Sequence, residues 1–123
     1  MPRVLIVDDE STPRVLLGKH FADAGYSVSF AGNGWEALLT MRTNAFDLIL
    51  CDLTMPGMGA LPFVAAMREE QKAHAPPVIV FTGPGDDVGE LVGLDVQAVL
   101  MKGQERLDEA LRTANELLGR AGE

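Results

Sequence analysis

The sequence predicts an α/β fold, a doubly wound parallel sheet of five strands with helices on both faces. Three observations support it. Five short apolar runs of strand length recur along the chain, and a helical pattern of apolar residues follows each run. Strands that alternate with helices form parallel sheets, and right-handed crossovers place the helices on both faces. The runs are residues 4–7, 27–30, 48–51, 78–81 and 98–101.

The first run and its helix set the pattern. Residues 4–7 are apolar without alternation, as in central parallel strands that are buried on both faces. Ser11 or Thr12 is the predicted N-cap of the helix, Pro13 lies in its first turn, and Gly25 ends it. The apolar stripe between them consists of Leu17, His20, Phe21 and Ala24. We therefore interpret His20 as a packing residue rather than a catalytic one.

The later elements repeat this alternation. Residues 27–30 alternate polar and apolar, which predicts a strand near a sheet edge. Pro62 lies in the first turn of the third helix, and Asp86 and Asp87 open a short fourth helix. We interpret these two acids as capping residues, because no strand end directs them at a site. Each of the four helices after the first also has a predicted apolar stripe. In chain order, these stripes are Gly34, Ala37, Leu38 and Met41; Phe63, Ala66 and Met67; Val88, Leu91 and Val92; and Leu107, Ala110, Leu111, Ala114 and Leu118.

Length and composition limit the classes of protein. The 123 residues fit a single domain, residues 1–123, and the 47% hydrophobic content is that of a globular chain. A net charge of -8 argues against a nucleic-acid partner, which requires a basic face. The single cysteine, Cys51, lies in an apolar run and is expected to be a buried hydrophobe. No signal peptide or membrane-spanning run is present in the sequence, so we expect a cytoplasmic protein without a membrane partner.

Polar residues follow four of the five apolar runs: Asp8 and Asp9, Asp52, Thr82, and Lys102. The carboxyl ends of parallel strands share one edge of the sheet, where open α/β folds bind ligands. Clustered carboxylates favour Mg²⁺, whereas a lysine and a hydroxyl suit phosphoryl oxygens. The set therefore predicts phosphoryl transfer with Asp52 as nucleophile. No histidine, serine or cysteine dyad and no glycine-rich phosphate loop competes for this role.

Five ordered motifs extend this interpretation to a family. They are Val7-Asp8-Asp9-Glu10, Asn33-Gly34-Trp35-Glu36-Ala37-Leu38, Asp52-Leu53-Thr54-Met55-Pro56-Gly57-Met58, Thr82 and Lys102. Together they resemble the receiver domain of two-component response regulators, over nearly the whole chain. The resemblance implies a flavodoxin-like fold with strand order 2-1-3-4-5. Because the sequence carries no effector domain after the last helix, we expect a stand-alone receiver.

The resemblance also implies roles for the acidic residues. Asp52 would be the phosphoacceptor, supplied by a phosphohistidine of a sensor histidine kinase or a histidine phosphotransfer protein. Asp9, Asp52 and the backbone carbonyl of Thr54 would ligate Mg²⁺ directly, and Asp8 would act mainly through water. The protein would assist its own phosphorylation and dephosphorylation without being a turnover enzyme.

Thr82 and Lys102 would contact the phosphoryl group, with Thr82 moving toward it as the switch. Three positions depart from the family pattern. Val99 replaces the aromatic residue three positions before the lysine, Gly103 replaces the proline after it, and Gly59-Ala60 replaces the usual Asp-Gly. The expected output is a downstream protein partner that binds the face formed by the helix predicted from residue 86, the strand at 98–101 and the last helix.

Two other functions remain open. The departures at Val99 and Gly103 allow a degenerate receiver that acts as a phosphorylation-independent adaptor. A Mg²⁺-dependent phosphohydrolase with an aspartyl nucleophile is less well supported, because Thr54 stands where haloacid dehalogenase-type enzymes carry a second acid. A flavodoxin-like electron carrier is weaker still, since residues 82–85 are too short to hold a flavin phosphate.

Overall fold

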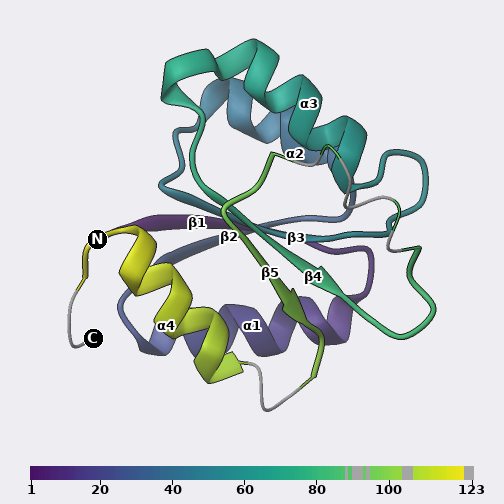
Figure 1. Ribbon diagram of the computed structural model, residues 1–123. Helices are drawn as coiled ribbons and strands as arrows, with labels where there is room; N and C mark the ends of the chain where they lie inside the picture. Colours follow the sequence, from purple (N-terminus) through teal and green to yellow (C-terminus); the bar gives the residue numbers. More distant parts are fainter. Residues whose placement is uncertain (88, 90–92, 94, 104–106, 121–123) are drawn as a thin grey trace.

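The computed structural model contains one parallel sheet of five strands in the order β2-β1-β3-β4-β5 (Figure 1). It describes residues 1–87, 89, 93, 95–103 and 107–120. The predicted fold class and strand order are confirmed, and the alternating second strand lies at an edge of the sheet. The strands are β1 (Arg3–Val7), β2 (Ser27–Ala31), β3 (Leu48–Asp52), β4 (Val78–Thr82) and β5 (Ala98–Met101).

Helices cover both faces of the sheet (Figure 1). Helices α1 (Ser11–Asp23) and α4 (Leu107–Leu117) pack on one face, whereas α2 (Gly34–Thr43) and α3 (Ala60–Gln71) pack on the other; a 3₁₀ turn, η1 (Lys72–His74), follows α3. Within the described residues, no helix has the length and apolar character that crossing a membrane requires. The helix predicted from Asp86, with its stripe at Val88, Leu91 and Val92, falls largely outside the described residues.

Strand β3 links the two cores because successive side chains point to opposite faces of a sheet. Leu48 and Leu50 join the core beneath α1 and α4, and Ile49 and Cys51 join the core beneath α2 and α3. All five residues of β3 are buried, as its uninterrupted apolar pattern predicts for a central strand. The strand therefore holds Asp52, its last residue, in a fixed position at the carboxyl edge.

The start of α1 differs from the prediction, which put the N-cap at Ser11 or Thr12. Glu10 is the N-cap, and the helix begins at Ser11 without a side-chain capping bond. Asp8 Oδ1 accepts a hydrogen bond from the Glu10 N–H at 2.9 Å, and this local turn brings the chain into the helix early. The predicted end is confirmed, because Gly25 follows the helix with φ +95°.

Two glycines in helices give a paired test of packing. We expect Gly34→Ala to lower the free energy of unfolding by about 1–3 kcal/mol, because a Cβ there would lie 2.8 Å from Met58 Cγ and 3.0 Å from its backbone oxygen. Gly18→Ala is the control: its Cβ would meet only the far end of the Phe30 side chain, which is 45% exposed and not backbone.

The control substitution should raise the free energy of unfolding by up to about 1 kcal/mol through the higher helix propensity of alanine. Urea denaturation of both variants measures the difference. Equal effects at the two positions would contradict the packing assigned to Gly34 against Met58.

Candidate functional site

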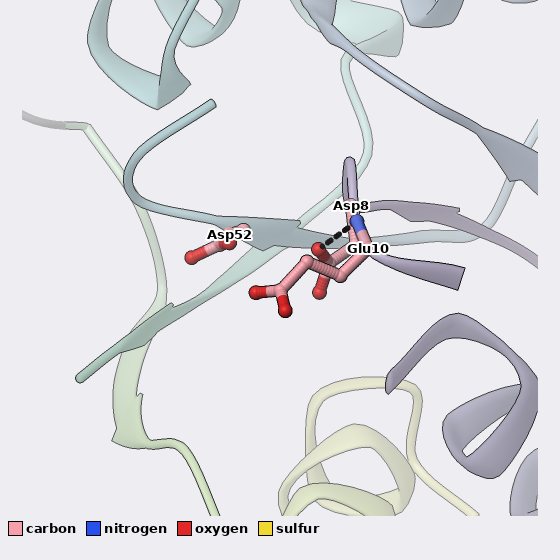
Figure 2. Close-up of side chains that lie close together, drawn as sticks. All are labelled: Asp8, Glu10 and Asp52. Carbon is pink, nitrogen blue, oxygen red and sulfur yellow. Dashed lines mark hydrogen bonds between the residues drawn. The ribbon is translucent and has the colours of Figure 1, made fainter. Parts of the chain in front are cut away.

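The ends of β1 and β3 bring two buried carboxylates to one edge of the sheet. Val7 pairs with Cys51 in the parallel register, so the residues that follow, Asp8 and Asp52, lie side by side. Asp8 is 5% exposed and Asp52 is 2% exposed. Figure 2 shows both at this edge, together with Glu10. The predicted convergence of these strand ends is confirmed.

Lys102, the residue after β5, reaches across to Asp52. Its Nζ lies 3.0 Å from each carboxylate oxygen and donates a hydrogen bond to Oδ2. Burial raises the pKa of Asp52 to about 6; the bond and charge of Lys102 oppose the rise, and the charge of Asp8 adds to it. Asp52 is therefore ionised at pH 7, and the positive charge of the nearby Lys102 favours this ionised form.

The acidic group extends to Glu10. Carboxylate oxygens of Asp8, Glu10 and Asp52 lie within 4.8 Å of one another. Burial also raises the pKa of Asp8, against the hydrogen bond from the Glu10 N–H. Asp9 is exposed and does not belong to this group. The backbone at Glu10 is extended. Asp8 and Glu10 are two residues apart, so their side chains lie on the same side of such a chain. This spacing is the signal in the sequence that places Glu10 at the site.

This group fits a divalent cation. Three carboxylates lie close together, and the ammonium of Lys102, 3.0 Å from both oxygens of Asp52, supplies a single positive charge against them. One ammonium group does not neutralise three clustered carboxylates, so a second cation would lower their mutual repulsion. Oxygen ligands are the ones that Mg²⁺ takes in proteins. Asp8, Glu10 and Asp52 are thus chemically suited to a Mg²⁺ ion.

Thr82 lies at the carboxyl end of β4 with its hydroxyl directed along the sheet. The hydroxyl donates to Met101 Sδ at 3.4 Å, and Thr82 and Met101 are register partners on β4 and β5. In this structure the hydroxyl is therefore engaged by a neighbouring strand rather than by Asp52. Sulfur is a weak acceptor, so this contact can be exchanged at little cost.

Asp86 contacts the loops that flank the site, although the sequence predicts a capping acid away from it. Its Oδ2 accepts a hydrogen bond from the Gly83 N–H at 2.7 Å, and its Oδ1 accepts one from the Thr54 hydroxyl at 3.3 Å. The interpretation of Asp86 as a capping acid unconnected to the site is wrong in this respect. A turn in the loop after β4 returns the side chain toward the loop after β3, and strand-end reasoning does not include such turns.

Cys51 precedes Asp52 and takes no part in the chemistry. It is fully buried, and burial raises the pKa of its thiol. A thiol that stays protonated is a poor nucleophile and a poor metal ligand. The prediction that Cys51 is a buried hydrophobe is confirmed.

Comparison with known proteins identifies the family. A sequence profile described as the response regulator receiver domain matches residues 4–112. The chain belongs to this family. Receiver domains are the response regulator modules of two-component systems.

Curated relatives of this receiver domain are transcriptional regulators. The probable transcriptional regulator ycf27 of Cyanidium caldarium is 37% identical over 77% of the chain and 37% of its own length. The transcriptional regulatory protein ResD of Bacillus subtilis is 33% identical over 76% of the chain and 38% of its own length. The chain thus spans less than half of the length of these relatives.

Solved structures resemble the whole receiver domain. The response regulator TrrA of Thermotoga maritima, in complex with Mg²⁺ and BeF, is 29% identical with a TM-score of 0.84, over 95% of this chain and 99% of that one. The chemotaxis response regulator CheY4 of Vibrio cholerae is 29% identical with a TM-score of 0.80, over 93% and 98%. The five-stranded receiver fold is therefore shown.

The buried charge of Asp52 predicts a pH-dependent stability difference. The pKa of Asp52 rises from 3.8 to about 6 on folding. The folded receiver domain therefore binds the proton more tightly than the unfolded chain, and it loses stability as the pH rises from about 4 to about 6. Without divalent cations, Asp52→Asn should raise the free energy of unfolding by about 1–3 kcal/mol at pH 8 and have little effect at pH 4.

Urea unfolding in EDTA across this pH range measures the effect. The exposed Asp9→Asn is the control, since it removes the same formal charge without relieving burial. A pH-independent gain for Asp52→Asn, or an equal gain for Asp9→Asn, would show that burial of the carboxylate is not the cause.

Proposed function

We propose that this receiver domain accepts a phosphoryl group on Asp52 from a phosphohistidine of a sensor histidine kinase or a histidine phosphotransfer protein. The observation that supports this most strongly is the buried Asp52, with Lys102 Nζ 3.0 Å from both oxygens, inside a group of three carboxylates. Such a site pairs a nucleophilic carboxylate with a fixed positive charge for the incoming phosphoryl oxygens.

In the proposed reaction, an Asp52 carboxylate oxygen attacks the phosphorus atom. The new P–O bond forms as the P–N bond to the donor imidazole breaks, and the imidazole leaves with the bonding electron pair. Lys102 pairs with one phosphoryl oxygen, and the Thr82 hydroxyl leaves Met101 to bond another. Bound Mg²⁺ supplies positive charge that offsets the carboxylates and the transferring group.

For the metal we propose Asp9, Asp52 and the Thr54 backbone carbonyl as direct ligands, with Asp8 acting through water. The family resemblance supports this set, whereas the geometry groups Glu10 rather than Asp9 with Asp8 and Asp52. Glu10 is exposed and has a longer side chain, so ordering it on a metal costs more conformational entropy than ordering Asp9. We therefore assign the third carboxylate to Asp9.

The proposed output is a change in the binding of a downstream protein. Val99 and Met101, on the face of β5 opposite Ala98 and Leu100, are 44% and 49% exposed, which leaves apolar surface beside the proposed switch residue Thr82. We propose that a partner binds the face of β5, α4 and the helix predicted from residue 86. The net charge of -8 favours a protein over a nucleic acid.

We further propose one receiver domain over residues 1–123, a cytoplasmic location, and a switch rather than a turnover enzyme.

A phosphorylation-independent adaptor is the second candidate. Val99 supplies no ring to report the movement of Thr82, and Gly103 has φ +147°, so the connection after Lys102 follows a path that proline cannot adopt. The complete set of Asp8, Asp52 and Lys102 favours the phosphorylated switch.

Phosphorylation should require Mg²⁺ and Asp52. We expect intact mass spectrometry to find one phosphoryl adduct after incubation with Mg²⁺ and acetyl phosphate. Asp52→Asn should abolish the adduct because the nucleophile is lost. Asp47→Asn is the matched control, since Asp47 has the same side chain just before the opposite end of β3 and is expected to leave the adduct unchanged.

An adduct that survives Asp52→Asn, or its absence from the native chain with Mg²⁺ present, would favour the adaptor. On the same samples, amide NMR shifts of Val99 and Met101 should move on phosphorylation. Unchanged shifts there would contradict the proposed output face.

The metal ligands can be separated by single substitutions. We expect Asp9→Asn to weaken Mg²⁺ binding by about 10-fold or more, and Glu10→Gln to weaken it by less than about threefold. Titration calorimetry with Mg²⁺ measures both, and the two variants remove the same formal charge from neighbouring exposed residues. A larger loss of Mg²⁺ affinity in Glu10→Gln than in Asp9→Asn would assign the third carboxylate to Glu10, which the structure groups with Asp8 and Asp52.

A further inference from the structure

Asp86 closes the turn that follows Thr82. Its N–H donates to the Gly83 carbonyl at 3.1 Å, and its Oδ2 accepts from the Gly83 N–H at 2.7 Å. Pro84 and Gly85 occupy the centre of this turn, and Gly85 has φ +90°, as the third position of a type II turn requires. The Pro84-Gly85 pair therefore fixes where the Asp86 carboxylate lies.

The same carboxylate reaches a second loop. Thr54, two residues after Asp52, donates its hydroxyl to Asp86 Oδ1 at 3.3 Å. Gly83, whose N–H occupies the other oxygen, directly follows Thr82. One anionic side chain thus holds two hydrogen-bond donors, one from each loop that carries a residue of the phosphorylation site.

Asp86 also acts on the cation of the site. Gly83 packs against Lys102, since a Cβ there would lie 3.3 Å from Lys102 Cδ. Burial lowers the pKa of Lys102, but the hydrogen bond from Lys102 to Asp52 and the charges of Asp52, Asp8 and Asp86 raise it above its usual value. The charge of the Asp86 carboxylate thus acts on Lys102, as the smallest of these contributions.

We propose that Asp86 is a positioning residue that competes with a phosphoryl group on Asp52. The contested donors are the Gly83 N–H and the Thr54 hydroxyl. A phosphoryl group is a strong anionic acceptor with three free oxygens, and its charge repels a neighbouring carboxylate. When the group is present, the donors pass from Asp86 to the phosphoryl oxygens; when it is absent, Asp86 holds them. This inference rests on the proposed phosphorylation of Asp52 and concerns how long the group is retained.

The experiment compares Asp86→Ala, Asp86→Asn and Asp87→Asn, each phosphorylated with Mg²⁺ and acetyl phosphate. Intact mass gives the rates of adduct formation and of loss after the donor is removed. The ratio of formation to loss should rise about five- to tenfold in Asp86→Ala. It should rise less in Asp86→Asn, whose amide oxygen can still accept from Gly83. Asp87→Asn should match the native chain, because Asp87 is exposed and bonds only the Gly89 N–H among the hydrogen bonds of the described residues.

A second readout separates competition from a structural role. In unphosphorylated Asp86→Ala, the Gly83 amide should exchange with solvent faster than in the native chain, as measured by NMR. Phosphorylation should then restore its protection, because the phosphoryl oxygens replace the missing carboxylate. A Gly83 amide that stays unprotected after phosphorylation would overturn the competition.

Other outcomes are equally decisive. Equal rises of the formation-to-loss ratio in Asp86→Asn and Asp87→Asn would mean that removing any negative charge near the site has this effect. That result would overturn the inference. A lower ratio in an Asp86→Ala protein with native-like thermal unfolding would mean that the carboxylate organises the site, which also overturns it. An unchanged ratio in Asp86 variants of a chain that does phosphorylate rejects this inference alone. No adduct on the native chain rejects the proposed function and the inference together.

Discussion

The burial of the Asp52 carboxylate beside Asp8 is the constraint on which the rest of this site depends. Two acids at the ends of adjacent parallel strands lose most of their hydration, and their mutual repulsion adds to that cost. The raised pKa of Asp52 is the result. Lys102 offsets part of the cost from the opposite side, through Nζ contacts of 3.0 Å to both oxygens. The excess of carboxylates over this one positive charge is what makes the site receptive to a further cation.

The sheet creates this constraint before any loop contributes. β3 is buried along its whole length, so its last residue cannot turn its carboxylate into bulk water without leaving the strand. The parallel register of β1 and β3 sets Asp8 next to Asp52. The end of β5 and the loops then supply exchangeable partners: Lys102 for the carboxylate, Met101 for the Thr82 hydroxyl, and Asp86 for the Thr54 and Gly83 donors. A rigid sheet edge thus holds the acids, and side chains with alternative partners surround them.

The difference between the rigid sheet edge and the turns and loops around it explains what the sequence could predict. Strand period and apolar runs identified all five strands, and the rule that parallel strand ends share an edge brought Asp8, Asp52 and Lys102 together. Glu10 and Asp86 were not placed at the site, because their positions depend on turns rather than on strand direction. The N-cap of α1 was misplaced for the same reason: the Asp8 side chain bonds the Glu10 N–H and starts the helix early. The roles of Asp9 and of the Thr54 carbonyl remain predictions.

The proposed switch lacks the usual aromatic residue, so it would have to transmit its state through what β4 and β5 share. Thr82 and Met101 are register partners, and their hydroxyl–sulfur contact is a side-chain hydrogen bond that joins the two strand ends. An acceptor as weak as a thioether gives up the hydroxyl easily, so little energy opposes a move of Thr82 toward a phosphoryl group. Met101 is 49% exposed, and methionine is a flexible side chain, so it would change its surroundings if that contact broke. The proposed signal would then reach the surface as a rearrangement of the Val99 and Met101 side chains, which needs no rotating ring and no buried cavity to receive one.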